Sequence, residues 1–283
     1  MNHSRAVPAV SVIIAARNEE NYIQPCLKAL LEQQGLKPGD LQVIVAANAC
    51  TDATVSVARD LTSSFTSRGW TLDVMSLADG GKLGAVAAAE QAATGRCLVY
   101  LDADVICDPR LLDQIADALD VPQPLYATGR LVVVPSPNML TRAYARIWQQ
   151  LPFVKQGAVG AGFFAMNRAG RGRWGDWPRI ISDDTFARLN FVPDERIEVA
   201  APYHWPMVEG FRNLVRVRRR QDAGVVELRN LYPHLFENDS KAPVTKGLAL
   251  RLLLKNPLAM IVYMAVHIAV RMKPASAEWT RGR

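Results

Sequence analysis

Residues 97–104 read Cys-Leu-Val-Tyr-Leu-Asp-Ala-Asp, an apolar run that ends in two aspartates spaced two apart. A run of this length and apolarity is typical of a strand that is buried on both faces of a parallel sheet. Because side chains alternate along a strand, Asp102 and Asp104 should point the same way where the strand ends. Two like charges so placed repel each other, which predicts a cation beside them.

Three earlier runs have the same strand-like character, and each of the four runs is followed by a helix-like segment. The predicted strands are Val10–Ala16, Leu41–Ala47, Thr71–Leu77 and Cys97–Leu101, and the predicted helices are Asn21–Gln34, Thr51–Phe65, Leu83–Ala93 and Pro109–Leu119. Four strand-helix repeats predict an α/β fold whose mostly parallel sheet carries helices on both faces.

In such open sheets ligands bind at the carboxyl ends of the strands, where the polar residues of this chain gather. These residues are Arg17, Asn18, Glu19, Asn48, Gly80-Gly81-Lys82, Asp102 and Asp104. Carboxylate oxygens at the end of a rigid strand suit Mg²⁺ or Mn²⁺, which keep open positions for phosphate oxygens. The alternative is that Asp104 only caps a turn. His204 is a candidate third metal ligand.

The glycines before Lys82 could let backbone N–H groups and the ammonium group approach phosphates. The spacing matches neither a Walker A loop nor a dinucleotide fingerprint, and a solvated lysine beside a turn remains an alternative.

The second half of the chain is less regular. It predicts a strand over Leu125–Val134, a helix over Asn138–Gln150 and a glycine-rich turn and strand over 157–166. A Ser-Asp start before an apolar run predicts a helix that begins near Asp183 and Asp184. This second acidic pair is either a pair of capping groups or a general base that takes a hydroxyl proton, and the spacing leaves both open.

The overall composition is that of a globular protein, with 49% hydrophobic and 21% charged residues among 283. The N-terminal apolar stretch runs directly into charged residues, which predicts a first strand rather than a secretory signal. The four cysteines form no CxxC pair, which predicts reduced core thiols of a cytosolic protein rather than a zinc site. The body of the chain is not basic, which argues against nucleic-acid binding.

The positive charge is concentrated at the C-terminus. Residues 241–283 hold eight Lys or Arg and one Glu, so the other 240 residues carry a net charge of about −1. Within this tail the fourteen-residue apolar segment 257–270 is shorter than the ~20 residues that span a membrane. It is interpreted either as a helix at an anionic membrane surface or as a last core helix.

Four segments, at residues 10–33, 41–54, 80–105 and 180–189, resemble in order and spacing the nucleotide-sugar glycosyltransferases of family 2, which have the GT-A fold. The resemblance is close over residues 9–108 and looser over 157–222. It implies a non-processive, hexosyltransferase-like enzyme that moves a sugar from a nucleoside-diphosphate sugar to an acceptor hydroxyl with inversion. It further implies Mn²⁺ or Mg²⁺ as cofactor and a UDP-sugar as donor.

The resemblance also implies roles for individual residues. Asp104 would be the closer metal ligand, Asp102 would be shared with the ribose, and Asp184, beside Asp183, would deprotonate the acceptor. Arg220 is what remains of the Gln-x-x-Arg-Trp element of processive members, so one or few sugars per acceptor are expected. The residues implied in donor and cofactor binding are Ala16, Arg17, Asn18, Glu19, Asn48, Lys82, Asp102, Ala103, Asp104 and Arg220.

These inferences predict a catalytic domain over 1–240, with a nucleotide-sugar half at 1–108 and an acceptor half at 109–240, and a basic amphipathic tail at 241–283. The tail predicts a cytoplasmic protein at the inner face of the plasma membrane, with a lipid-linked or cell-envelope glycan as acceptor. Two alternatives are a catalytically inactive, membrane-associated partner protein and a sugar nucleotidyltransferase. The latter would require a glycine-rich basic loop where Ala15-Ala16-Arg17-Asn18 stands.

Overall fold

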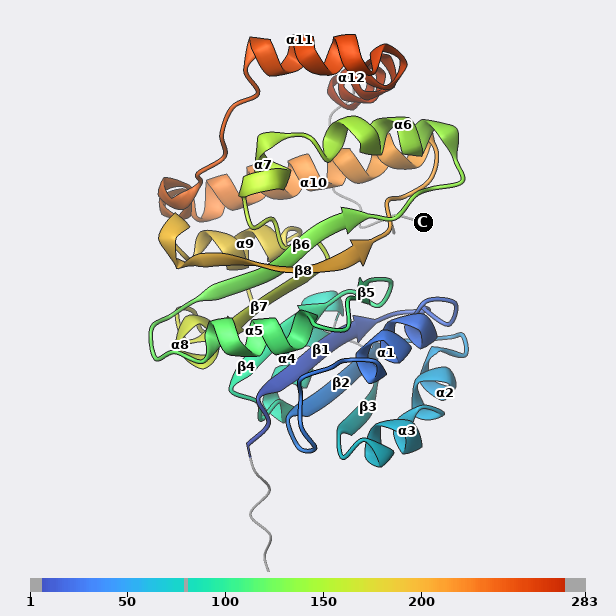
Figure 1. Ribbon diagram of the computed structural model, residues 1–283, viewed down its shortest axis with the longest axis vertical. Coiled ribbons are helices and arrows are strands. Elements are labelled where there is room, and N and C mark those ends of the chain that lie inside the picture. The colour runs from blue at the N-terminus through green and yellow to red at the C-terminus, as the bar shows by residue number, and fades with distance from the viewer. Residues whose placement is uncertain (1–6, 79–80, 273–283) are drawn as a thin grey trace, which may run out of the picture. The chain divides into compact units, whose positions relative to one another are not determined.

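The computed structural model describes residues 7–78 and 81–272, which fall into two compact units (Figure 1). The first unit comprises Met1–Leu131, Gly160–Arg179 and Asp194–His204, and the second comprises Val132–Val159, Ile180–Pro193 and Trp205–Arg283, each as far as it is described. The units are interleaved along the chain, whereas the predicted domains are contiguous, and the domain boundaries stay a prediction. Gly80 and the end of the predicted tail beyond residue 272 lie outside the described residues.

The predicted α/β fold is confirmed by an eight-stranded sheet with the order β3-β2-β1-β4-β7-β6-β8-β5. Its parallel part consists of β1 (Val10–Ala16), β2 (Leu41–Asn48), β3 (Thr71–Leu77) and β4 (Cys97–Leu101). Antiparallel pairs add β7 (Phe163–Asn167) and β6 (Tyr126–Val133) on one side of β4, and join β5 (Ile106–Cys107) to β8 (Arg196–Trp205).

The central strands lie where their sequences require. Nearly every residue of β1, β2 and β4 is buried, because these strands have neighbours on both sides and helices on their faces. The edge strand β3 has a mixed burial pattern. The register pairs Val10 with both Leu41 and Cys97, so the three strands end at the same edge of the sheet. The polar residues that follow them are thereby gathered at this edge.

Helices of the first unit lie on both faces of this sheet (Figure 1). The α-helices of this unit are α1 (Ile23–Leu31), α2 (Thr54–Arg59), α3 (Thr62–Ser67), α4 (Gly81–Ala92), α5 (Leu111–Leu119) and α8 (Arg168–Arg171). The 3₁₀ helix η1 (Pro193–Glu195) stands where the chain passes from the second unit back to the first. The prediction of a single helix over Thr51–Phe65 is wrong in one respect, because the helix is interrupted at Asp60 and Leu61 and forms α2 and α3. Helix α4 packs on β1 and β2.

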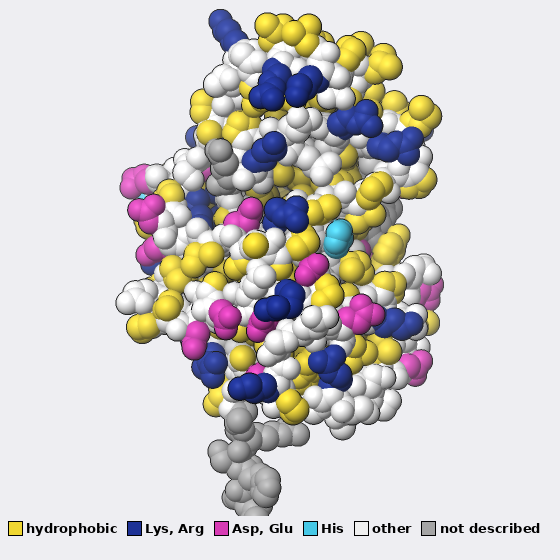
Figure 2. All heavy atoms as spheres, viewed as in Figure 1, with side chains coloured by type: hydrophobic (Ala, Val, Ile, Leu, Met, Phe, Trp, Pro, Cys, Tyr) yellow, Lys and Arg dark blue, Asp and Glu magenta, His cyan; other side chains and the backbone are white. Residues whose placement is uncertain are grey.

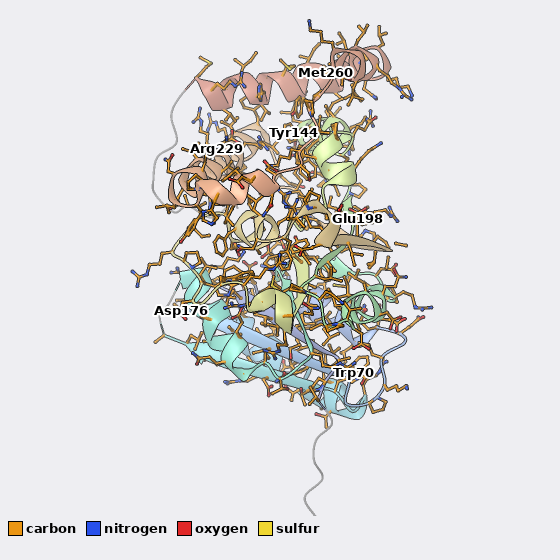
Figure 3. All side chains as sticks on the ribbon, turned by 90° about the vertical axis from the view of Figure 1, so that its left-hand side faces the viewer. Trp70, Tyr144, Asp176, Glu198, Arg229 and Met260 are labelled. Carbon is orange, nitrogen blue, oxygen red and sulfur yellow. The ribbon has the colours of Figure 1, made fainter. Side chains whose placement is uncertain are left out.

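The second unit is mostly helical. Its helices are α6 (Met139–Trp148), α7 (Pro152–Gln156), α9 (Asp183–Leu189), α10 (Phe211–Leu231), η2 (Pro233–Asn238), α11 (Lys246–Lys255) and α12 (Pro257–Arg271). The apolar tail segment forms α12, which packs on α6 and α10. Met260 of α12 packs against a small core of Ile147, Leu252 and Ala259, and Tyr144 of α6 stacks on Tyr263 of α12 (Figure 3). Among the residues described, no helix is long and apolar enough to cross a membrane.

Candidate active site

The aspartate pair lies directly beyond β4, at the edge where the parallel strands end. The Asp102 N–H donates to the carbonyl of Gly162 at 2.9 Å, and the Val105 N–H donates back to the Asp102 carbonyl at 3.1 Å, which fixes a turn. Asp102 and Asp104 are half-buried, while Ala103 and Val105 between and after them are buried. This alternation is what two carboxylates on one side of the chain require.

A cation lies beside the first carboxylate. Lys82 Nζ is 3.2 Å from Asp102 Oδ1, and the two side chains are 38% and 41% exposed. Lys82 is the second residue of α4, directly after Gly81, whose φ of +62° favours glycine. An ion pair this exposed contributes about 0–1 kcal/mol, so a metal ion or a phosphate could replace either partner at little cost.

The donor atoms at this edge fit a hard divalent ion. Two aspartate carboxylates on a rigid strand end suit Mg²⁺ or Mn²⁺, which take their remaining ligands from water and substrate phosphates. Within the described parts of the chain, no group of three or more His, Cys, Asp or Glu residues is placed to hold a metal. His204 pairs with Ile106 across β8 and β5, two residues after Asp104, and its role as a third ligand stays a prediction.

The loops after β1 and β2 are tied to each other by side chains. Asn18 has a positive φ of 54°, and its amide bonds to Thr51: Oδ1 accepts from the Thr51 N–H at 2.8 Å, and Nδ2 donates to Thr51 Oγ1 at 3.1 Å. The Glu19 N–H donates to Thr54 Oγ1 at 2.7 Å. Asn18 thus holds the two loops together, which is a shaping role that its sequence position did not reveal.

Asp52 completes this junction. It accepts bonds from the Thr54 hydroxyl at 2.5 Å, from the Thr54 N–H at 3.0 Å and from the Glu20 N–H at 3.2 Å. Desolvation alone would raise the pKa of Asp52, but these hydrogen bonds lower it below its ordinary value. The sequence signal that could have identified this junction is the Thr-Asp-Ala-Thr run at 51–54, because Ser, Thr and Asp commonly bond to N–H groups at a helix start.

Asn48 is the last residue of β2 and is only 4% exposed. Its Oδ1 is buried and has no hydrogen-bond partner within residues 7–78 and 81–272. A buried acceptor without a donor costs about 1–3 kcal/mol, so such a group commonly serves a ligand. The prediction that Asn48 takes part in donor binding has a physical basis in this unpaired oxygen and stays a prediction.

A mostly buried carboxylate links α4 to β4. Glu90 Oε1 accepts from Tyr100 Oη at 2.5 Å and from Trp177 Nε1 at 2.6 Å, and Glu90 Oε2 accepts from Arg171 Nη2 at 2.8 Å. Tyr100 lies two residues before Asp102, and Glu90 lies on the helix that carries Lys82. This cluster of four residues therefore fixes the two elements whose ends form the Lys82–Asp102 pair. Sequence reasoning missed it entirely.

The second acidic pair belongs to the second unit. Asp183 and Asp184 open α9, as predicted, and Asp183 is buried. Asp184 Oδ1 accepts from the Thr185 N–H at 2.6 Å, while the Ser182 side chain makes no capping bond. An aspartate in the first helical turn is consistent with a capping group and also with a base held near its place of action.

Helix α10, which the sequence did not predict, supports the start of α9. The Ile181 N–H donates to Glu227 Oε2 at 2.8 Å, and Gly224 lies so close that an added Cβ would be 2.2 Å from Ser182 Oγ. Arg220 also lies on α10 and is half-buried. Lys241, whose pKa burial lowers, interacts electrostatically with Asp184. The ion-pair partner of Lys241 is Asp239, at 3.9 Å, in the segment after η2.

Comparisons with known proteins agree with this architecture. The profile of glycosyl transferase family 2 matches residues 11–175, which is more than half of the chain. The structure is similar to the mannosyltransferase PcManGT from Pyrobaculum calidifontis, in complex with GDP-Man and Mn²⁺, at 24% identity and a TM-score of 0.60, over 96% of this chain and 77% of that one.

It is also similar to S. aureus TarS 1-349 in complex with UDP, at 15% identity and a TM-score of 0.52, over 93% of this chain and 81% of that one. A comparison with curated proteins gave no match. The two structural likenesses support the GT-A fold, and the profile match supports the family. The chain therefore belongs to glycosyl transferase family 2.

Proposed function

We propose that this family 2 glycosyltransferase moves a sugar from a nucleoside-diphosphate sugar to an acceptor hydroxyl by one inverting displacement. The proposal is carried by two features at one edge of the sheet. Asp102, which follows β4, is paired with Lys82 at 3.2 Å, and Asn48, the last residue of β2, has an unpaired side-chain oxygen. A base-binding group and a diphosphate-binding group on one edge are what a nucleotide sugar needs.

In this mechanism the acceptor oxygen forms a bond to the anomeric carbon as the bond from that carbon to the diphosphate oxygen breaks. Asp184 accepts the hydroxyl proton, and the electron pair of the broken bond leaves with the diphosphate. Asp104 and Asp102 would hold Mn²⁺ or Mg²⁺, which supplies Lewis-acid stabilisation of the charge on the leaving group. Lys82 would exchange its bond with Asp102 for a phosphate oxygen and so add a second positive charge there.

We propose a UDP-sugar as donor, with a GDP-sugar as the competing candidate. The structure of PcManGT holds GDP-Man and Mn²⁺, and that of TarS holds UDP, so relatives in fold use both bases. Uracil and guanine each present a ring N–H that could donate to Asn48 Oδ1. The identity of the base is therefore a question for binding measurements.

The proposed acceptor is a lipid-linked or cell-envelope glycan at the inner face of the plasma membrane. The concentration of positive charge in residues 241–283 supports such a location. Arg216, Arg218 and Arg220 on α10 offer guanidinium groups that could bind acceptor phosphates.

The test is thermal denaturation with UDP and GDP, each with and without Mn²⁺. A ligand at ~100 times its Kd stabilises the native state by about 2.7 kcal/mol, a readily measured increase in Tm. We expect one nucleotide to raise Tm in a Mn²⁺-dependent way. Asp104→Asn should remove this shift. The control Asp117→Asn, at an exposed aspartate of α5, should leave it intact. Asp184→Asn should keep the shift and lose sugar transfer. A folded protein that shifts with neither nucleotide would instead support the inactive partner protein.

A further inference from the structure

Helices α11 and α12 are apolar on two sides, but the second unit covers only one of them. On the covered side Leu252, Ala259 and Val266 are buried, and Tyr263 stacks on Tyr144 of α6 with ring centroids 5.2 Å apart. Soluble helices normally present polar residues on the side away from the core. On the second side of these two helices the exposed side chains are mostly large and apolar, so this side requires an explanation.

The open side carries a continuous row of large apolar side chains. On α12 Leu258, Ile261 and Ile268 are joined by the small Ala265 at a spacing of three and four, which places them along one face, with Met264 beside it and Met272 directly after the helix. Leu254, Leu258 and Met272 are 75%, 77% and 77% exposed. We name this row the outer apolar surface, and it comprises Leu250, Leu253, Leu254, Leu258, Ile261, Met264, Ile268 and Met272.

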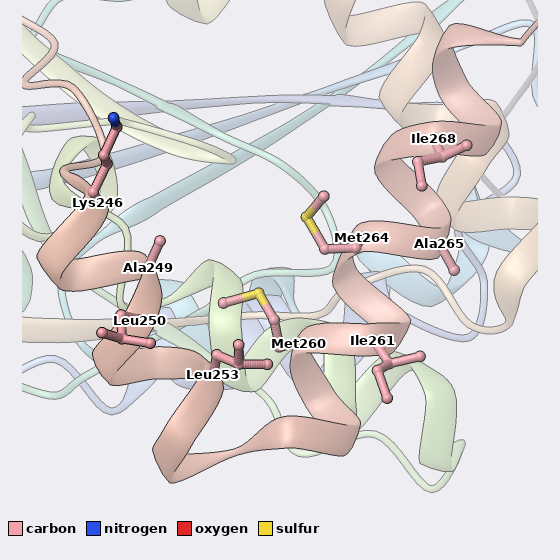
Figure 4. Close-up of a pocket in the computed structure, with 9 residues that line it drawn as sticks. All are labelled: Lys246, Ala249, Leu250, Leu253, Met260, Ile261, Met264, Ala265 and Ile268. Atoms are coloured by element: carbon pink, nitrogen blue, oxygen red, sulfur yellow. The ribbon is translucent and has the colours of Figure 1, made fainter.

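The outer apolar surface contains a groove between the two helices. The groove has a volume of about 720 Å³ and is lined by residues of both helices, with Lys246 as its one charged member (Figure 4). Contiguous apolar surface of this kind is rare on soluble monomers and commonly marks a contact with a membrane or a partner.

The charge around this surface favours one occupant. Lys246, Arg251, Lys255 and Arg271 are exposed on the same helices, and residues 246–272 contain no acidic residue. Hydrophobic side chains and Lys or Arg side chains lie together over α11 and α12, at the top of the view in Figure 2. A second copy of this surface would bring like charges together, whereas an anionic headgroup layer would be complementary.

The lengths of the helices define how they can meet a bilayer. At 1.5 Å per residue, α12 with its 15 residues is roughly 22 Å long, and α11 is shorter. The hydrocarbon core of a bilayer is about 30 Å thick, so neither helix spans it. With one side packed on α6 and α10, the pair can only lie in the plane of the interface.

We propose that the outer apolar surface docks flat on an anionic lipid bilayer. Its eight apolar side chains enter the boundary between headgroups and acyl chains, and the four Lys and Arg side chains contact lipid phosphates. The inference deepens the proposed location at the membrane by naming the surface that makes the contact. It does not depend on sugar transfer, because docking requires neither donor nor acceptor.

The experiment is flotation of the full chain with vesicles of phosphatidylcholine alone and of phosphatidylcholine mixed with phosphatidylglycerol. We expect binding to the mixed vesicles, weakened by salt and weaker on phosphatidylcholine alone. The double variant Leu254→Gln, Leu258→Gln should bind roughly tenfold or more weakly, because each exposed leucine loses its apolar contact with lipid. The matched control is Val226→Gln on α10, which is exposed to 59% and lies outside the surface.

Folding and function are checked on the same samples. The double variant should keep its Tm and its nucleotide-induced shift, since both leucines are largely exposed. Equal flotation of the double variant and the wild type would overturn the proposal, as would failure of the wild type to bind mixed vesicles. A dimer that the double variant abolishes, without vesicle binding by the wild type, would assign the surface to a second copy instead. A wild-type protein that floats with the mixed vesicles but shows no nucleotide-induced shift in Tm would count against the proposed function alone.

Discussion

Replacing Glu90 by leucine is the most informative perturbation of the support beneath the candidate site. The Glu90 and Arg171 side chains are 13% and 16% exposed, and the carboxylate accepts bonds from Arg171, Tyr100 and Trp177. Burial alone would lower the pKa of Arg171, but its hydrogen bonds with Glu90 raise it above the usual value. The Glu90→Leu change leaves this guanidinium charged, mostly buried and without its carboxylate.

The expected cost follows from that geometry. Removing one partner of a buried ion pair costs about 3–5 kcal/mol, because the other charge remains uncompensated. For a chain of this size each kcal/mol lowers Tm by about 2–4 °C, so Glu90→Leu should lower Tm by roughly 6–20 °C. Since Glu90 joins α4 to β4, the nucleotide-induced stabilisation should weaken as well.

The assay is a double-mutant cycle by thermal and urea denaturation. Arg171→Met in the Glu90→Leu background removes the stranded charge, so the double variant should be more stable than Glu90→Leu alone. Glu32→Ala, a change at an exposed carboxylate after α1, is the control and should leave Tm nearly unchanged. Additive costs in the double variant, or a Tm for Glu90→Leu equal to that of Glu32→Ala, would refute the reasoning.

Three further predictions concern single residues. Lys82→Met should change stability by less than about 1 kcal/mol, because its pair with Asp102 is exposed, yet weaken binding of a nucleoside diphosphate more than that of the nucleoside in calorimetry. Asn48→Leu should keep or raise Tm and lose the nucleotide-induced shift; a large fall in Tm would mean that its oxygen has an internal partner.

Burial, together with the charges of Arg271 and Arg218, lowers the pKa of His267. The His267 imidazole therefore binds a proton more readily in the unfolded chain than in the folded one. The free energy of unfolding should therefore be unaffected by His267 above about pH 6.5 and should fall as the pH drops below that value. His267→Gln should reduce the accompanying fall in Tm. A Tm profile against pH that is the same in both proteins would contradict this assignment.

The parts of the fold that could be predicted are those encoded by local patterns. The strands at Val10–Ala16, Thr71–Leu77 and Cys97–Leu101 have the predicted bounds, because a buried strand shows its apolar run directly in the sequence. Strand β8 was missed, since Pro202 interrupts a run that is only partly buried. Helix α10 was missed because its arginines obscure the apolar face that buries Leu214 and Leu228.

The features of the candidate site also divide into those that local sequence patterns encode and those that depend on tertiary packing. The sequence by itself determined that Asp102 and Asp104 share one side of the chain and that polar residues follow the buried strands, because the period of a strand is local. Only the tertiary structure decided that Lys82 is the cation beside Asp102, that Asn18 is bonded to Thr51, and that Asn48 holds an unpaired oxygen. It likewise decided that Glu90 accepts a bond from Trp177, 87 positions away. Such pairs depend on how helices and strands pack, and no local period encodes which distant side chains that packing brings together.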